Sequence, residues 1–246
     1  MLPESLKMMS KNRPDEIESI RETSKIGLEL FVYNIKENSF SSAVFEETGK
    51  LQQELNKQVK EFISQQAENQ YDEFYYLDTE FLEDKLTALS EMNIVYAYKD
   101  FEINVKKLLE STYKIGVKEF YKWESILSFL KSKGIKPSTL KGFEEIDQLR
   151  QLNNHIKHCT SQSITPKINN IQEFKDLRYL RHYELTEFFN RINNYPYIFL
   201  ENLSAEIYKN LYEFDTIRIQ SIAEMFALRM DKQSANTFIE ELKKFY

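Results

Sequence analysis

The sequence predicts an all-α protein, and three observations lead to that fold class. Glycine and proline occur only five times each in 246 residues, against ordinary frequencies of about 7% and 5%, so the turns that a β-rich fold needs are scarce. Apolar residues recur at helical spacing through most long segments. No segment approaches the roughly 18 apolar residues of a membrane-spanning helix. We therefore expect one all-α domain over residues 1–246, with no membrane span.

The first half of the chain predicts three long helices. Pro14 opens the first helix, with Asp15 and Glu16 in its first turn, where the helix dipole favours acids. The second is expected over residues 43–68. The region 72–113 contains neither glycine nor proline, but its apolar stripe changes direction near Asn93. We expect Asn93 to divide that region into two helices.

The second half predicts shorter helices. An amphipathic helix is expected over residues 119–133, with Gly134 after its end and Pro137 as a stop signal. A further helix over 143–159 carries a polar run, and residues 160–170 are expected to form a loop. The remaining helices are predicted at 172–193, 199–214, 221–230 and 234–245.

Composition excludes several classes of function. The single cysteine, Cys159, cannot build a disulfide framework and fits a reducing cytoplasm. The net charge of −6 gives no general support for nucleic-acid binding. The five glycines are too far apart for a phosphate-binding loop, which excludes kinase, P-loop and Rossmann functions. We expect a cytoplasmic protein without a cofactor.

The polar run at residues 150–159 holds two of the three histidines. At about 100° per residue, one side of its helix is expected to face the core: Ile146, Leu149, Leu152, Ile156 and Cys159. The opposite side carries Asp147, Arg150, Asn154 and His158, and His155 lies on the flank. Arginine can hold a phosphate with two hydrogen bonds, and histidine can transfer a proton near neutral pH. The stripe therefore suits attack on a phosphodiester, although the same residue types also make an ordinary solvated helix face.

Residues 149–158 resemble the motif helix of the HEPN (higher eukaryote and prokaryote nucleotide-binding) superfamily. The surroundings are also similar, because Tyr98 and Glu102 lie on a long preceding helix and the segment from Trp123 precedes the motif helix. The resemblance covers residues 85–215 and implies a HEPN-like bundle of long antiparallel helices. Residues 1–70 would then form an N-terminal helical extension.

The resemblance implies a homodimer with a metal-independent endoribonuclease site, in a defence, abortive-infection or toxin–antitoxin setting. The family motif of Arg-x4–6-His fits two registers. One pairs Arg150 with His155, and the other places Asn153 in the arginine position before His158. The resemblance implies that His155 or His158 deprotonates the ribose 2′-OH, that Arg150 stabilises the phosphorane, and that Asn154 belongs to the site. If Arg150 does not serve His158, a domain without nuclease activity results.

A second basic cluster extends the hypothesis. Arg178, Arg181 and His182 are expected on the following helix, where they would join Lys157 in binding RNA. Neighbouring acids at 176, 184 and 187 also allow a charge-balanced face. A metal site from His155, His158 and Cys159, completed by Glu184 or His182, is disfavoured because the two histidines lie about 60° apart on the helix. We therefore expect no bound metal.

Aromatic residues gather in the central region, and we expect them in the core and in a subunit interface: Tyr71, Phe74, Tyr75, Tyr76, Phe81, Tyr96, Tyr98 and Phe101. Two functions remain open. One is RNA cleavage or binding, and the other is a non-catalytic helical interaction module, such as an immunity, antitoxin or scaffold protein, that binds a protein partner.

Overall fold

The structure is a computed structural model that describes residues 14–37, 40–66, 74–116, 118, 120–158 and 163–245. Over these residues the predicted all-α class is confirmed. The described part contains no β-strand, and its β-type pairing is limited to an isolated antiparallel bridge between Ser163 and Tyr179. No described helix combines the length and apolar character that a membrane span requires.

The chain divides into two compact units. The larger unit spans Val32–Leu203, and the smaller contains the described parts of 1–31 and 204–246. Two helices, α2 (Pro14–Glu37) and α9 (Tyr195–Tyr212), contribute residues to both units. The predicted single domain, with a HEPN-like core at 85–215 and an extension at 1–70, stays a prediction.

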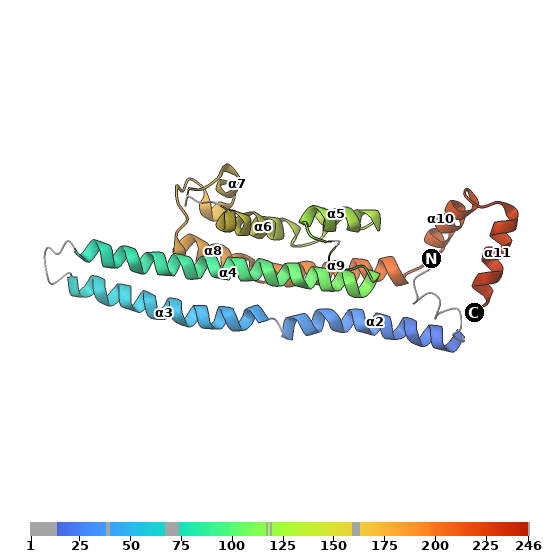
Figure 1. Cartoon of the computed structure of the whole chain (residues 1–246), viewed down its shortest axis with the longest axis horizontal. Coiled ribbons are helices and arrows are strands. Elements are labelled where there is room, and N and C mark those ends of the chain that lie inside the picture. Colours follow the sequence, from blue (N-terminus) through green and yellow to red (C-terminus); the bar gives the residue numbers. More distant parts are fainter. Residues whose placement is uncertain are drawn as a thin grey trace. The chain divides into compact units, whose positions relative to one another are not determined.

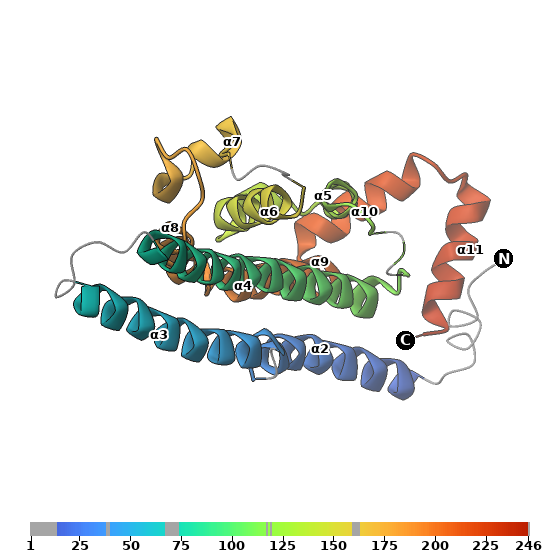
Figure 2. The ribbon, with the colours of Figure 1, turned by 60° about the vertical axis from the view of Figure 1, so that its left-hand side comes forward.

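Helix α4 (Phe74–Tyr113) is the centre of the larger unit. Three other helices pack against it: α3 (Phe40–Gln66), α6 (Phe143–His158) and α8 (His182–Ile192). Figures 1 and 2 show α3 running alongside α4 and α6 lying on another side of it. Because α4 contacts all three, it fixes where the polar helix α6 lies.

The predicted break at Asn93 is wrong, because α4 continues through it. Asn93 is buried, and its Oδ1 accepts a hydrogen bond of 2.6 Å from Oγ1 of Thr48 on α3. One turn earlier, Ser90 Oγ accepts a bond of 2.8 Å from Gln52 of α3. An asparagine favours a break when its amide competes for backbone groups. Here a partner helix occupies the amide oxygen, so α4 keeps its backbone ladder.

Aromatic side chains fill the core where α4 meets the start of α9. The Phe101 ring lies 5.7 Å from that of Phe199 and 5.8 Å from that of Trp123 in α5 (Trp123–Ser132). Tyr98 and Phe101 are buried within the chain, which confirms their core assignment, whereas Phe81 is 59% exposed. The side chains of residues 71 and 74–76 lie outside the described part.

Helix α5 begins at Trp123, later than predicted, and ends as expected before Gly134. Gly134 has φ +80° and donates to the Lys131 carbonyl, while Ile135 donates to the Leu130 carbonyl. This pair of bonds is a Schellman motif, which glycine permits because it tolerates positive φ. The short 3₁₀ helix η2 (Pro137–Thr139) follows and leads into α6.

The predicted helix over 172–193 is wrong in its first half. It consists of the 3₁₀ helix η3 (Gln172–Phe174), a non-helical segment, and α8 from His182. The predicted loop before it contains the short helix α7 (Pro166–Asn169). Phe174 and Leu180 are both buried, and Asp176 turns the chain between them with φ +63°. The backbone leaves the helical conformation between Phe174 and Leu180, so that both side chains are buried.

The smaller unit ends in α10 (Thr216–Ala227) and α11 (Lys232–Lys243), which begin earlier than predicted. Asp215 and Asp231 cap them by accepting bonds from the backbone N–H groups of Arg218 and Ser234. These N-caps are a sequence signal that the apolar spacing alone did not reveal. The Arg218 guanidinium in turn donates to the carbonyl of Lys209 at the end of α9.

Candidate functional site

Helix α6 presents the predicted polar run, with two corrections to its orientation. Asn153 and His155 are buried, at 1% and 6% exposure, although His155 was expected on a flank. Ile156, expected in the core, is only half-buried. Asn154 and His158 are exposed, as their places on the side opposite the core predicted, and Lys157 is exposed as well. The buried sector of α6 is thus centred nearer to Leu149 and Leu152 than the apolar pattern implied, because α4 and α8 both pack on it.

Arg150 is held by an acid on its own helix. Its Nε and Nη2 atoms donate to Oδ1 of Asp147, at 3.0 and 2.7 Å. The second carboxylate oxygen of Asp147 accepts from Nε2 of Gln151 at 2.6 Å. The Arg150 side chain is 22% exposed, so its guanidinium is oriented by this pair while part of it still reaches solvent.

The Tyr98 phenol on α4 lies within electrostatic range of this ion pair and of two further acids, Glu102 of α4 and Glu124 of α5. The pKa of the buried Tyr98 phenol is raised, first by burial and then by the charges of Glu102, Glu124 and Asp147, while Arg150 opposes the shift. Glu102 is itself paired with Lys106 at 2.7 Å. Acids therefore outnumber cations around the Tyr98 phenol.

The two histidines of α6 lie in different environments. Burial lowers the pKa of His155, so its imidazole is neutral at physiological pH. His158 is exposed in the last helical turn. Neither register of the family motif has both members exposed, because His155 is buried in the first and Asn153 in the second. The accessible arginine and histidine are Arg150 and His158, eight residues or about 12 Å apart along the helix axis.

The second basic cluster was predicted to lie on one helix, and this prediction is wrong. Arg178 and Arg181 lie in the non-helical segment, and His182 is the first residue of α8. Nδ1 of His182 lies 2.7 Å from Oε2 of Glu83 on α4. The approach lacks hydrogen-bond geometry, since Nδ1 has no hydrogen-bond partner, so the attraction depends on protonation of the imidazole.

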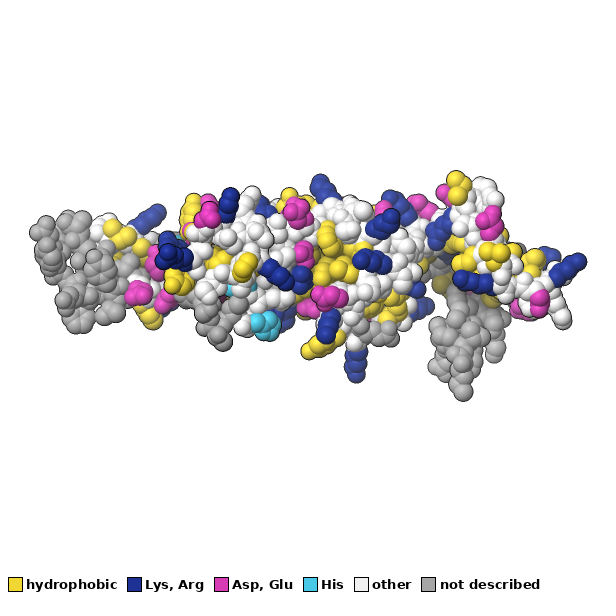
Figure 3. Space-filling view, turned by 90° about the horizontal axis from the view of Figure 1, so that it is seen from above, with side chains coloured by type: hydrophobic (Ala, Val, Ile, Leu, Met, Phe, Trp, Pro, Cys, Tyr) yellow, Lys and Arg dark blue, Asp and Glu magenta, His cyan; other side chains and the backbone are white. Residues whose placement is uncertain are grey.

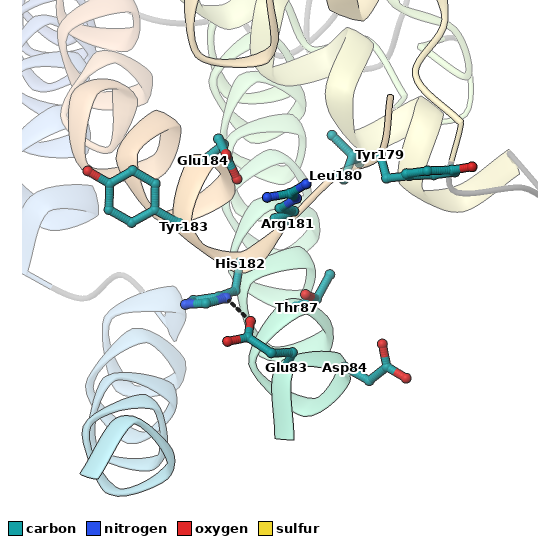
Figure 4. A pocket seen from close by; sticks show the side chains of 9 residues that line it. All are labelled: Glu83, Asp84, Thr87, Tyr179, Leu180, Arg181, His182, Tyr183 and Glu184. Atoms are coloured by element: carbon teal, nitrogen blue, oxygen red, sulfur yellow. Dashed lines mark ion pairs between the residues drawn. The ribbon is translucent and has the colours of Figure 1, made fainter. Parts of the chain in front are cut away.

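Arg181 and His182 line a pocket of about 570 Å³ between α4 and the start of α8. Figure 4 shows its side chains, with Glu83, Asp84 and Thr87 coming from α4. Sequence reasoning missed these three residues and Tyr179 as site residues. Glu83, Asp84 and Thr87 lie about a hundred positions from Arg181 in the sequence, and Tyr179 belongs to no motif. Only the packing of α8 on α4 shows that these residues share a pocket.

No group of three or more histidine, cysteine, aspartate or glutamate side chains in the described part is placed to hold a metal ion. Cys159, the third member of the disfavoured metal set, lies outside the described residues. Figure 3 shows acidic and basic side chains interspersed over the face that it presents, without a wide area of one sign. Such a surface offers local contacts to phosphate but no extended basic track.

No protein-family model, no curated protein and no solved structure matches this chain. The resemblance of residues 149–158 to the HEPN motif helix therefore rests on the sequence alone.

Proposed function

We propose that this protein is a HEPN-like, metal-independent endoribonuclease that works as a homodimer in a defence or toxin–antitoxin setting. One observation carries the proposal. Arg150, Asn154 and His158 follow one another along a single face of α6, and each reaches solvent, while the two polar residues that break the pattern are buried. An arginine, an amide and an imidazole on one accessible stripe provide phosphate binding, hydrogen bonding and proton transfer.

In this proposal the cleavage is a transesterification within the RNA. The imidazole of His158 takes the proton of a ribose 2′-OH, and the 2′-oxygen forms a bond to the adjacent phosphorus. The bond from phosphorus to the 5′-oxygen breaks, and that oxygen is protonated by an acid or by water. Arg150 stabilises the extra negative charge of the phosphorane, and the product carries a 2′,3′-cyclic phosphate. Asn154 holds a phosphate oxygen, and Lys157 contributes positive charge.

The spacing on α6 supports a dimeric site. Arg150 and His158 are about 12 Å apart along the axis, and Asp147 draws the Arg150 guanidinium away from His158, toward the start of the helix. One copy therefore does not place both groups on one phosphate. Two α6 helices side by side in antiparallel orientation would bring Arg150 of each copy toward His158 of the other.

A second function, a non-catalytic helical interaction module, is favoured by a different observation. The Asp147–Arg150 pair is complete within α6. The Asp147 carboxylate would repel a phosphate and leaves the arginine little unsatisfied charge. In that case the polar run is a structural face, and the protein acts by binding a protein partner as an immunity, antitoxin or scaffold protein.

Incubation of the purified full chain with total cellular RNA in EDTA distinguishes the two functions. The variants are Arg150→Ala, His155→Ala and His158→Ala, with Lys141→Ala as an exposed control just before α6. Loss of a general base typically reduces a rate by about 10² to 10⁴. We expect that loss in His158→Ala, a loss in Arg150→Ala, and wild-type cleavage in Lys141→Ala.

The state of the protein must be checked alongside cleavage, because His155 is buried and its loss affects folding. Circular dichroism and size-exclusion chromatography provide that check. No cleavage by folded, dimeric wild type would refute the nuclease and leave the interaction module. Cleavage that persists in His158→Ala but is lost in a folded His155→Ala would indicate that His155 is the general base.

A further inference from the structure

The pocket between α4 and the start of α8 carries an inference that is independent of RNA cleavage. It is formed by two segments almost a hundred residues apart, and its volume of about 570 Å³ falls in the range of small-molecule sites. Its walls differ in charge. The α4 wall presents Glu83 and Asp84, and the opposite wall presents Arg181 at the N-terminus of α8.

The basic wall is suited to a carboxylate. Arg181 is exposed, and no ion pair of its guanidinium occurs among the described residues. Arg181 is also the N-cap residue of α8, an eleven-residue helix that has no side-chain cap. The start of α8, where the helix dipole is positive, therefore lies at the pocket, because residues 181–184 line it. Glu184, in the first turn, offsets part of this field.

The acidic wall is suited to an ammonium group. Asp84 is exposed and has no ion-pair partner within the described ranges, whereas Glu83 faces His182 at 2.7 Å. In Figure 4, Asp84 and Thr87 lie on the same side of the pocket as Tyr179, and Tyr183 points away from them. Tyr179 is 55% exposed, so its ring is available to cover the apolar part of a bound molecule.

We propose that this pocket binds a small zwitterion of amino-acid size, with its carboxylate on Arg181 and the start of α8 and its ammonium on Asp84. Glu83, Asp84 and Glu184 would repel a purely anionic ligand, and Arg181 would repel a purely cationic one. A zwitterion would offer a negative group to Arg181 and a positive group to Asp84, which line the same pocket.

The test uses the full chain and the twenty amino acids as probes, with binding measured by ligand-observed NMR and then by calorimetry. For each amino acid that binds, the matching amide removes the carboxylate charge and the matching N-acetyl derivative removes the ammonium. We expect each derivative to bind at least about tenfold more weakly, since hydrogen bonds to charged groups are worth that much or more.

Two variants assign the walls. Arg181→Gln should lower the affinity for the amino acid to that for its amide, and should leave the affinity for the amide unchanged. Asp84→Asn should lower the affinity for the amino acid to that for its N-acetyl derivative, and should leave the affinity for that derivative unchanged. Lys175→Gln removes an exposed positive charge from the same non-helical segment without touching the pocket, and it should bind as wild type does.

Three outcomes would overturn the proposal. They are no binding of any of the twenty at millimolar concentration, amides or N-acetyl derivatives that bind as tightly as the parent amino acid, and equal weakening by Lys175→Gln. The RNA assay is separate, because amino-acid binding does not depend on His158. Failure of cleavage with intact binding would refute only the nuclease, and the reverse would refute only this pocket.

Discussion

The ion pair between Glu173 of η3 and Arg191 of α8 should be a main stabilising contact between these two elements. Arg191 Nε donates to Oε1 of Glu173 at 2.5 Å, and its Nη2 donates to Oε2 of Glu173 and to Oε1 of Gln148 on α6, both at 2.9 Å. The Glu173 side chain is 7% exposed and that of Arg191 28%. Removing the carboxylate leaves a half-buried guanidinium with a single side-chain partner.

The magnitude follows from these contacts. Breaking a buried ion pair by removing one partner costs about 3–5 kcal/mol, and the partial exposure of Arg191 lets water recover some of that loss. We expect Glu173→Ala to lower the free energy of unfolding by about 2–4 kcal/mol. Glu173→Gln keeps the shape and one acceptor, so it should cost about 1–2 kcal/mol. Urea denaturation followed by circular dichroism measures both changes.

The pH dependence gives an independent check. Burial raises the pKa of Glu173, but the hydrogen bonds from Arg191 and Gln172 outweigh it, and the net pKa lies below the ordinary value of 4.5. The ionised carboxylate therefore stabilises the fold above the unfolded pKa, and this stability is lost as the pH falls through the folded pKa. The difference in the free energy of unfolding between wild type and Glu173→Gln should have its full size at pH 7 and should decrease below about pH 4.5.

An exposed pair provides the control. Glu206 and Lys209 are 2.7 Å apart, with side chains 41% and 56% exposed, and Glu206→Gln should give no measurable change in the urea midpoint. Equal effects of Glu173→Gln and Glu206→Gln, or a Glu173→Gln difference that stays constant down to pH 3, would refute the reasoning.

Three further results are expected. Gly142→Ala should lower the free energy of unfolding by about 1–3 kcal/mol, because φ is +89° and the added Cβ would lie 3.3 Å from the Tyr195 carbonyl oxygen. Gly134→Ala should lower it by less, because φ is +80° there but no atom lies within 4 Å of the added Cβ. Thermal unfolding of both variants compares the two effects. Thr48→Val should cost about 1–3 kcal/mol in urea denaturation, because it removes the donor to the buried Asn93 Oδ1. In a histidine NMR titration, His155 should have a midpoint below 6.5 because burial disfavours its charged form, and a midpoint at or above that value would contradict its burial.

The sequence determined the fold class and most helices. The shortage of glycine and proline and the helical spacing of apolar residues predicted an all-α chain, and the described residues agree. The end of α5 was also predictable, since Gly134 is a local signal for a C-terminal cap. These features depend on backbone preferences and neighbouring residues, which a sequence displays directly.

Tertiary structure alone decided the continuity of α4, the break before α8, and the orientation of α6. Asn93 stays helical because Thr48 of another helix occupies its amide, and residues 175–181 leave the helical path because Phe174 and Leu180 are both buried. His155 is buried because α4 and α8 pack on α6 from two directions, and Arg181 and Asp84 line one pocket only because α8 starts beside α4. Each outcome depends on a partner far away in the sequence, and residue spacing along one helix contains no information about such partners.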